Sequence, residues 1–363
     1  MINSFIYEQP VKIHFGFGKL SELANILDDI NAESCVLVSS KFFTEKCKAL
    51  MESCSKIKAI YCSVQPNPLL SGVEETVKLV KENNADTVIA LGGGSAIDTA
   101  KFAAACAYSR IEPAEHYQSP AFPEKRAKIV AIPTTSGTGS EVTKVSVISH
   151  GDEKKSIHNP AFMPTVCIVD PELTMTVPAK TTMITGIDAF THAIEAYWSV
   201  NHQPITDALA IESIKIILAN LEKSFEIGDK QSRTNMACAS LMAGLAFAVP
   251  KTAACHACSF PISAGYRLPH GEACALTLDS LMMINNDERL EHLAHEVGCE
   301  CTADLAAKVK HFKKIAGLCT SLSELGNVDI DKLAADCQKH PLMANNPVKL
   351  SADDLKAMFE KLQ

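Results

Sequence analysis

Between about residue 10 and residue 180, short apolar, β-branched runs alternate with amphipathic segments. The amphipathic segments carry apolar residues at spacings of three and four, which is typical of helices that pack one face on a sheet. They are Leu20–Leu27, Phe42–Met51, Val73–Glu82 and Ile97–Ala105. The strand candidates are Val11–Phe15, Cys35–Ser39, Ile57–Cys62, Thr87–Leu91, Lys128–Pro133, Thr143–Ile148 and Thr165–Val169. This alternation predicts an array of βαβ units around a parallel sheet.

After Asp170 and Pro171 the pattern changes, because strand-like runs disappear and long helical periodicities follow. The clearest of these are Ile205–Leu221, Thr234–Ala248, Gly271–Met283 and Thr302–Leu318. A chain of 363 residues is long enough for two apolar cores. We therefore expect an α/β domain over residues 1–180 and an all-helical domain over residues 181–363.

The composition, with 47% hydrophobic and 21% charged residues, is that of a folded globular protein. A net charge of −8 without a basic stripe argues against nucleic acid as a partner. The apolar helical stretch Met236–Val249 is shorter than the roughly 20 residues of a membrane span, so we expect no membrane insertion. Fourteen cysteines, together with a first segment that lacks an export signal, favour the reducing cytoplasm.

A glycine-rich loop, Leu91–Lys101, lies where a buried strand ends and a helix begins. Glycines there let the backbone approach a ligand, and the free N–H groups of the helix start attract a diphosphate. The loop does not match the G-x-G-x-x-G fingerprint of dinucleotide-binding Rossmann folds. The alternative interpretation of its glycines is a turn needed only for packing the helix against the strand. A second loop, Pro133–Thr143, adds hydroxyls and flexible amides at the same edge of the predicted sheet. The two loops together predict a dinucleotide site.

Four residues of the second half form a candidate metal site. Asp188 and His192 are four residues apart, so on a helix both side chains lie on one face. His256 and His270 lie beside apolar helical patterns. Three imidazoles and one carboxylate suit Fe²⁺ or Zn²⁺. The alternative is that each histidine is an ordinary hydrogen-bonded residue.

A competing site is the C-x-x-C pair Cys255 and Cys258, with Cys299 and Cys301 downstream. Such thiols can hold a structural zinc ion when four ligands are within reach. These cysteines instead interrupt helical patterns of small residues, which favours the mixed histidine and aspartate site.

These residues and several ordered motifs resemble the iron-containing (group III) alcohol dehydrogenases, over nearly the whole chain. The motifs are Phe15–Gly18, Pro66–Pro68, the two loops, Gly186–Ala189, the segment around His256, and Pro269–Gly271. The resemblance implies the dehydroquinate synthase-like architecture, in which an N-terminal dinucleotide-binding α/β domain precedes a helical domain. It also implies a divalent ion, usually Fe²⁺, and a homodimer or a larger homo-oligomer.

The resemblance carries the metal-binding role to the same four residues, Asp188, His192, His256 and His270. It carries contacts with NAD(H) or NADP(H) to Asn67, Gly93, Gly94, Ser95, Asp98, Thr134, Thr135, Thr138 and Lys154.

The chain departs from the family pattern at two positions. Phe260 stands where many members have a histidine implicated in proton transfer, so a proton must travel through water, the cofactor ribose or another side chain. Ser40 stands where NAD-preferring members often have an aspartate that repels a 2′-phosphate, and Lys41 follows it. We therefore predict that NADPH is accepted.

We hypothesise that the chain transfers hydride between a nicotinamide and a small aldehyde or alcohol, with the ion polarising the carbonyl. The segments that follow His256 and His270 look most like the subgroup acting on aldehydes with an anionic tail, such as phosphonoacetaldehyde, sulfoacetaldehyde or succinate semialdehyde. Lys144 and Arg267 could pair with such a tail, although both could be solvated charges, and Phe260 is a further substrate candidate. The alternatives are a dehydroquinate synthase-like or glycerol dehydrogenase-like metalloenzyme and a non-catalytic sensor.

Overall fold

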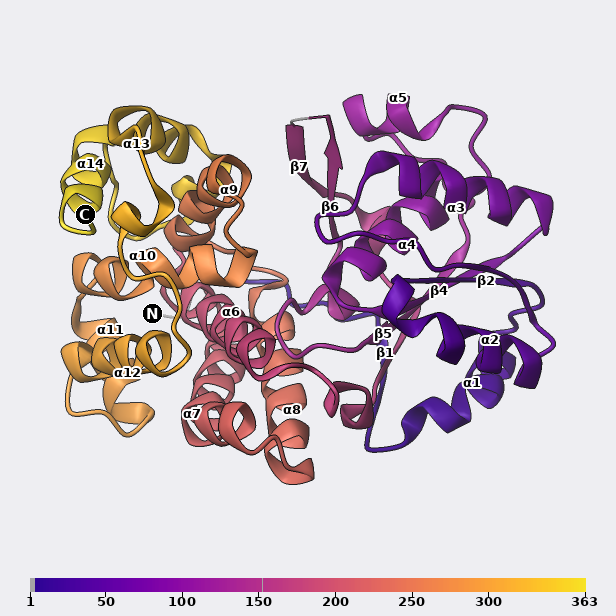
Figure 1. Cartoon of the computed structure of the whole chain (residues 1–363), viewed down its shortest axis with the longest axis horizontal. Coiled ribbons are helices and arrows are strands. Elements are labelled where there is room, and N and C mark those ends of the chain that lie inside the picture. The colour runs from indigo at the N-terminus through magenta and orange to yellow at the C-terminus, as the bar shows by residue number, and fades with distance from the viewer. Residues whose placement is uncertain (1–3, 152) are drawn as a thin grey trace. The chain divides into compact units, whose positions relative to one another are not determined.

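The computed structural model describes residues 4–151 and 153–363, and the chain divides into two compact units. The first, which we call the α/β unit, comprises Glu8–Thr135 and Ser140–Thr174. The second, the helical unit, comprises Met175–Gln363, the short segment Ser136–Gly139 and the described residues before Glu8. Figure 1 shows both units, coloured by residue number from the N-terminus to the C-terminus.

The α/β unit is built on a six-stranded sheet in the order β1-β8-β5-β4-β2-β3, in which every neighbouring pair is parallel. The strands are β1 Lys12–Phe15, β2 Cys35–Ser39, β3 Ile57–Tyr61, β4 Thr87–Gly92, β5 Lys128–Pro133 and β8 Val166–Val169. Ser39 pairs with Leu91, and Gly92 with Pro133. The loops after β2, β4 and β5 therefore leave the same edge of the sheet.

Apolar clusters cover both faces of this sheet. The helices are α1 Leu23–Asp29, α2 Thr44–Ser53, α3 Leu70–Glu82, α4 Gly94–Cys106 and α5 Pro113–Gln118. The 3₁₀ turns are η1 Lys19–Glu22, η2 Lys41–Phe43, η3 Ser140–Val142, η4 Pro160–Phe162 and η5 Pro171–Thr174. One cluster joins α1 and α2 to the sheet, and α3 and α4 lie on the other side, as Figure 1 shows. This layering explains why β2 and β4 are buried throughout.

One strand prediction was wrong in its pairing. The run predicted at Thr143–Ile148 forms β6, Val145–His150, which pairs antiparallel with β7, Glu153–His158, outside the parallel sheet. Burial along β6 alternates, which is typical of a ribbon with one covered face. Its Ile148 packs with Ile157 of β7 against the apolar cluster of α3 and α4.

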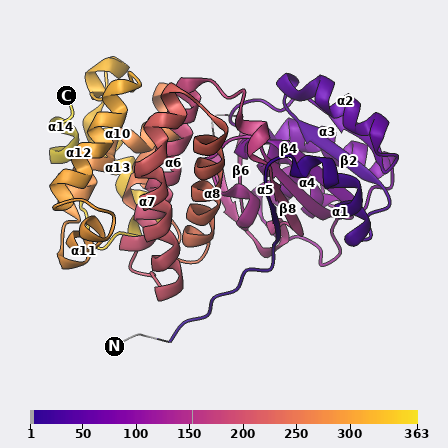
Figure 2. The same cartoon turned by 90° about the horizontal axis from the view of Figure 1, so that it is seen from below.

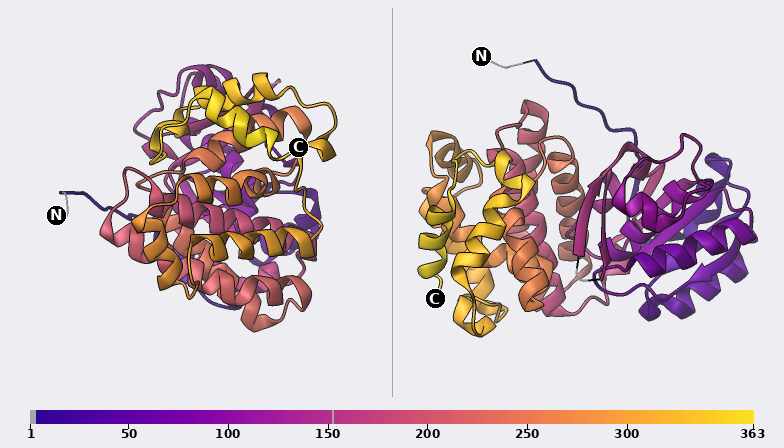
Figure 3. Two further views of the ribbon diagram at one scale, coloured as in Figure 1. Left: turned by 90° about the vertical axis from the view of Figure 1, so that its left-hand side faces the viewer. Right: turned by 90° about the horizontal axis from the view of Figure 1, so that it is seen from above.

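The helical unit contains no strand in its described part, and its long helices surround α6. Its helices are α6 Ala179–Trp198, α7 Pro204–Glu226, α8 Lys230–Phe247, α9 Ala254–Tyr266, α10 His270–Ile284, α11 Glu288–Glu296, α12 Thr302–Ile315, α13 Ile330–Lys339 and α14 Ala352–Glu360, with 3₁₀ turns η6 Leu322–Leu325 and η7 Pro341–Asn345. Helices α7, α8 and α10 pack on α6, and α13 packs on α14 (Figures 2 and 3).

Gly186 shows how closely α6 and α7 approach each other. A methyl group at this position would lie 2.2 Å from Leu221 Cδ1 of α7. Phe190 and Ile187 of α6 are fully buried in the same core, beside Met236 of α8. The buried surface of α6 is thus fixed by packing on several sides.

In the described residues, no helix combines the length and apolar character that a membrane crossing requires.

Candidate functional site

Helix α6 places three ionisable side chains on one buried face. Asp188, His192 and Glu195 are separated by four and three residues, which brings them to the same side of a helix. Their relative exposures are 3%, 6% and 0%. Burying such groups costs free energy unless they are paired or bind an ion.

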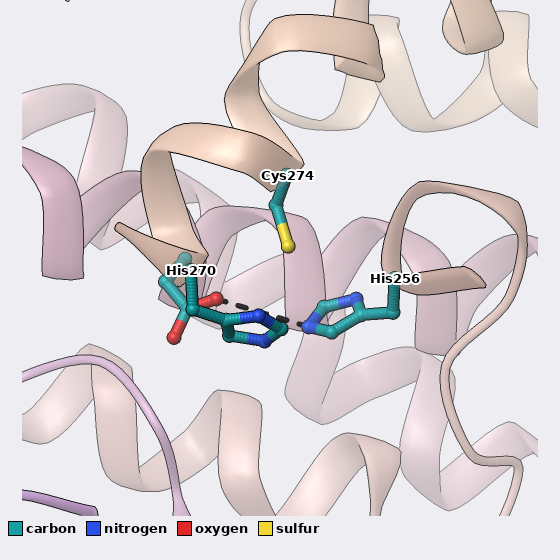
Figure 4. Close-up of side chains that lie close together, drawn as sticks. His256, His270 and Cys274 are labelled. Carbon is teal, nitrogen blue, oxygen red and sulfur yellow. Dashed lines mark ion pairs between the residues drawn. The ribbon is translucent and has the colours of Figure 1, made fainter. Parts of the chain in front are cut away.

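Four potential ligands converge beside this face, as Figure 4 shows for three of them. Asp188, His256, His270 and Cys274 each offer one ligand atom, and these atoms lie within 4.8 Å of one another. His256 Nε2 is 3.7 Å from Asp188 Oδ1. Three helices contribute: α6 supplies Asp188, the first turn of α9 supplies His256, and α10 begins at His270.

Gly271 allows α10 to approach α6 closely enough for this cluster to form. A methyl group at this position would lie 2.4 Å from the carbonyl oxygen of Ile184 and 3.0 Å from Asp188 Cβ. Any side chain would therefore push the start of α10, and with it His270, away from Asp188. In the sequence Pro269-His270-Gly271, the glycine is therefore needed for packing and the histidine offers the potential ligand atom.

Glu195 orients the imidazole of His256. Its Oε2 is 2.5 Å from His256 Nδ1, and its Oε1 accepts a hydrogen bond of 2.6 Å from the backbone N–H of Cys255. A carboxylate accepts, so the ring proton lies on Nδ1 and the lone pair on Nε2, which faces Asp188. A carboxylate behind a histidine is the usual support of a metal-ligating imidazole.

The cluster fits a divalent ion. His256 Nε2 is buried and makes no hydrogen bond to any residue that the structure describes. Burial, reinforced by the neighbouring His192, lowers the pKa of His256 to about 3, so the ring is neutral. A neutral, buried imidazole nitrogen directed at a carboxylate is suited to ligate a cation. The same burial raises the pKa of Glu195 to about 7.

His192 lies beside this cluster. Its Nδ1 is 3.2 Å from the carbonyl oxygen of Gly137, and its ring stacks on Phe247 at a centroid distance of 4.2 Å. Its ring centroid is 4.4 Å from that of His256. Donation from Nδ1 to Gly137 leaves Nε2 as a lone pair, so its predicted role as a ligand is compatible with its surroundings.

The competing cysteine pair does not build a site of its own in the described residues. Cys255 and Cys258 are fully buried within α9, and neither belongs to the cluster of potential ligands. The thiol of Cys337 donates a long hydrogen bond of 4.0 Å to the backbone carbonyl oxygen of Cys258.

One substrate candidate, Phe260, contacts His270, and another, Arg267, precedes it by three residues in the sequence. Phe260 meets the His270 ring edge-on at a centroid distance of 5.7 Å and stacks on His340 at 4.7 Å. Arg267 ends α9 in the left-handed conformation, with φ of 57°, and is exposed. A non-glycine residue held there is strained, and strain of this kind occurs often at functional sites.

The glycine loop of the α/β unit forms the predicted strand-to-helix junction. Gly93 is the N-cap of α4, Gly94 is the first helical residue, and Ser95 follows. A methyl group at Gly92 would lie 2.7 Å from Ala96 Cβ, so the turn is tight. Thr134 and Thr135 come directly after β5, at the same edge of the sheet. The amide groups at the start of α4 thus adjoin hydroxyl-bearing residues, as an anion site requires.

Asp98, a predicted cofactor contact, is held inside the α/β unit. Its Oδ1 accepts from Ser140 Oγ at 2.7 Å and its Oδ2 from the Val147 N–H at 3.0 Å. The buried Lys101 ammonium donates to Ser140 Oγ at 2.9 Å. These bonds tie α4 to the second loop and to β6, so Asp98 has a structural role beside the predicted one.

The structure brings two other predicted cofactor residues together. Asn67 has a φ of 57°, and its Oδ1 accepts a hydrogen bond of 2.8 Å from Lys154 Nζ. Ser40 follows β2 as the N-cap of η2. Thr138 belongs to the segment Ser136–Gly139 of the helical unit, whereas the substrate candidate Lys144 is half-buried in the α/β unit.

Sequence reasoning missed one member of the cluster of potential ligands, Cys274, and the residue that supports this cluster, Glu195. Glu195 could have been found from its position three residues after His192, on the same helix face. Cys274 lies four residues after His270, which is again one face of a helix. Its signal was weak because the chain has fourteen cysteines.

Comparison with known proteins covers both units. The profile of the family described as iron-containing alcohol dehydrogenase matches residues 10–171, and the profile of the C-terminal domain of the Fe-containing alcohol dehydrogenase family matches residues 182–363.

Individual relatives span nearly the full length of the chain. A sulfoacetaldehyde reductase from Bifidobacterium kashiwanohense, solved in complex with NAD⁺, is 36% identical, covers 99% of each chain and superposes with a TM-score of 0.95. An NADPH-dependent butanol dehydrogenase from Clostridium saccharobutylicum is 35% identical over 97% of this chain and 96% of its own. A long-chain-alcohol dehydrogenase from Geobacillus thermodenitrificans is 32% identical over 97% and 95%.

Proposed function

We propose that this chain, which belongs to the iron-containing alcohol dehydrogenase family, reduces a small aldehyde that carries an anionic tail. Membership makes it a metal-dependent, NAD(P)-linked oxidoreductase acting on CH–OH groups. The same membership favours hydride transfer over the dehydroquinate synthase-like alternative and over a non-catalytic sensor.

We assign the divalent ion to Asp188, His192, His256 and His270. The observation that carries this assignment is the buried His256 Nε2, which lies 3.7 Å from Asp188 Oδ1 and makes no hydrogen bond within the described residues. An Fe²⁺ or Zn²⁺ ion held there would polarise the substrate carbonyl, while the nicotinamide supplies the hydride.

The residues of the chain prepare this site for catalysis. Glu195 fixes the His256 tautomer, because it accepts the Nδ1 proton and leaves Nε2 for the ion. Asp188 and His256 are almost fully buried, and the lower local dielectric strengthens the attraction of their ligand atoms for a cation. Phe260 presents a ring without an ionisable proton beside His270. The proton delivered to the product oxygen must therefore come through water, the cofactor ribose or another side chain.

The anionic tail of the substrate would meet Arg267 or Lys144. Arg267 is exposed, strained in its backbone and three residues from His270, a position suited to a charge that binds a sulfonate, phosphonate or carboxylate. The likeness to a sulfoacetaldehyde reductase supports this substrate class.

The cofactor would bind along the carboxyl edge of the sheet, with its diphosphate at the start of α4. We propose that NADPH is accepted, because Ser40 brings no negative charge to the end of β2 and Lys41 follows it. The relatives include one named as NADPH-dependent and one solved with NAD⁺, so both forms occur among similar proteins.

We further propose a cytoplasmic homodimer or larger homo-oligomer. All fourteen cysteines are free in the structure, and eleven of them are buried, as suits a reducing compartment. Family likeness supports self-association, which light scattering of the purified protein tests directly.

A substrate panel tests the proposed specificity. The kcat/KM for sulfoacetaldehyde and succinate semialdehyde should exceed that for butyraldehyde, with NADH and with NADPH. Arg267→Ala should lower only the anionic values, by about 10–100-fold for a lost charged hydrogen bond. Arg110→Ala, which removes an exposed arginine of the α/β unit, is the control. Equal efficiency on charged and neutral aldehydes would overturn the anionic assignment but not the family.

A further inference from the structure

His340 belongs to a row of aromatic rings that begins at His270. Phe260 meets the His270 ring edge-on, and the His340 ring stacks on Phe260 at an interplanar angle of 17°. His340 is also within electrostatic reach of His256, because the pKa of His256, lowered chiefly by burial and by His192, is lowered further by a positive charge on His340. His340 therefore lies close to the ion cluster without being a member of it.

The surroundings of His340 hold its imidazole in one orientation. The side chain caps η7, because its Nδ1 accepts a hydrogen bond of 3.3 Å from the backbone N–H of Leu342. The backbone N–H of His340 donates to the carbonyl oxygen of Cys337 at the end of α13. The following Pro341 favours an extended backbone at His340, which has φ of −68° and ψ of 131°. A side chain held in this way loses little entropy when it binds a ligand.

The contact with Leu342 also decides where the ring proton of His340 lies. A backbone N–H can only donate, so Nδ1 carries the lone pair and the proton of the neutral ring is on Nε2. Burial lowers the pKa of His340, which favours this neutral form. Within the described part of the chain, the Nε2–H group has no acceptor. The ring is thus a half-buried hydrogen-bond donor, fixed in place and available to a ligand.

Such a donor suits the tail of the proposed substrate better than its reacting group. The reacting carbonyl belongs at the ion cluster, whereas His340 contacts Phe260. To deliver a proton to the product oxygen, the ring would first need a second proton on Nδ1, where the Leu342 N–H already points. An oxygen of a sulfonate, phosphonate or carboxylate needs only a hydrogen-bond donor.

We propose that His340 Nε2–H donates to an oxygen of the anionic tail and so determines specificity for charged aldehydes. This inference rests on the proposed function, and it adds a fixed neutral donor to the charged candidates Arg267 and Lys144. Loss of the donor should weaken only substrates that bring an acceptor to this position.

Two substitutions in the full-length protein separate a donor from an acid. His340→Gln keeps an N–H near the position of Nε2 but cannot act as an acid, whereas His340→Leu removes the donor. For sulfoacetaldehyde, kcat/KM should fall by about 10-fold or more in His340→Leu, mainly through KM, and should stay close to the wild-type value in His340→Gln. The kcat/KM for butyraldehyde should be unchanged in both variants. His292→Leu, which removes an exposed histidine of α11, is the matched control.

Inhibition by ethanesulfonate, which carries the tail without the aldehyde, gives a second readout. Its inhibition constant against sulfoacetaldehyde should rise in His340→Leu but not in His340→Gln. Equal losses on charged and neutral aldehydes would overturn the proposal, because a structural or acid role gives that pattern. If the wild type prefers anionic aldehydes and His340→Leu keeps that preference, this inference fails and the proposed substrate class stands. A wild type that reduces both kinds of aldehyde equally contradicts both.

Discussion

The imidazole of His256 is constrained on two sides. Glu195 accepts its Nδ1 proton, and Asp188 lies opposite Nε2. This arrangement leaves Nε2 as the nitrogen that can bind an ion. Glu195 therefore determines the chemistry of the site, although it is not itself a ligand in our assignment.

Glu195→Gln should weaken ion retention while the fold persists. The amide keeps the shape but can present its NH₂ group to Nδ1, which disfavours the required tautomer. We expect about 10–100-fold weaker binding of Zn²⁺, measured by competition with a chelator. Glu226→Gln, at the exposed end of α7, should leave the affinity unchanged. Unaltered affinity in Glu195→Gln would show that Glu195 does not orient the ligand.

At this scale the sequence predicted the ion cluster only in part. Asp188, His256 and His270 could be singled out because the four-residue spacing of Asp188 and His192 and the two further histidines beside apolar helical patterns occur together with the glycine loops of a dinucleotide site. Cys274 could not, since a thiol is among the most commonly buried side chains. The contact of His192 with Gly137 depends on how a distant loop folds back, which no local pattern reports.

The elements that carry the ligands are held together by close helix packing. Helices α6, α9 and α10 each supply at least one ligand, and Gly271 permits the approach of α10 to α6. The position of His270 therefore depends on packing between helices as much as on its own neighbours.

Gly271→Ala should lower both stability and ion affinity. The added methyl group meets the backbone oxygen of Ile184, which cannot rotate away, so α10 must shift. We expect a loss of about 1–3 kcal/mol in the free energy of unfolding, measured by denaturant titration.

The control is Gly265→Ala on α9, where a methyl group would meet nothing within 4 Å. It should be neutral or stabilising by up to about 1 kcal/mol, because alanine favours a helix. Equal stability of the two variants would contradict the packing argument.

Secondary structure could be predicted well where burial is continuous. The strand expected at Lys128–Pro133 forms β5 over the same residues, because both faces of the sheet are covered. The pairing of β6 could not be predicted, since an alternating pattern identifies a strand but not its partner.

For the whole molecule, the family assignment confirms the predicted fold class and the predicted oxidoreductase activity. The predicted boundary at residue 180 and the ligand and cofactor residues stay predictions. Each unit carries its own part of the chemistry: the loops at the carboxyl edge of the sheet in one, the ion cluster in the other.

Ion removal should destabilise the helical unit. A ligand that binds only the folded state stabilises it by about 4 kcal/mol at a thousandfold excess over its Kd. Chelation should therefore lower the Tm, at about 2–4 °C per kcal/mol, and added Zn²⁺ should restore it. His270→Ala should show no such difference. If neither the chelator nor added Zn²⁺ changed the Tm, no ion would bind the folded chain.

The central claim is that one divalent ion, held by side chains of α6, α9 and α10, is required for hydride transfer. The most direct test measures ion content by mass spectrometry and NADH or NADPH oxidation, in anaerobically purified wild type and His256→Ala. We predict about one ion per chain with aldehyde-dependent turnover in the wild type, and loss of both together in the variant. Full turnover by a variant that holds no ion would contradict the account.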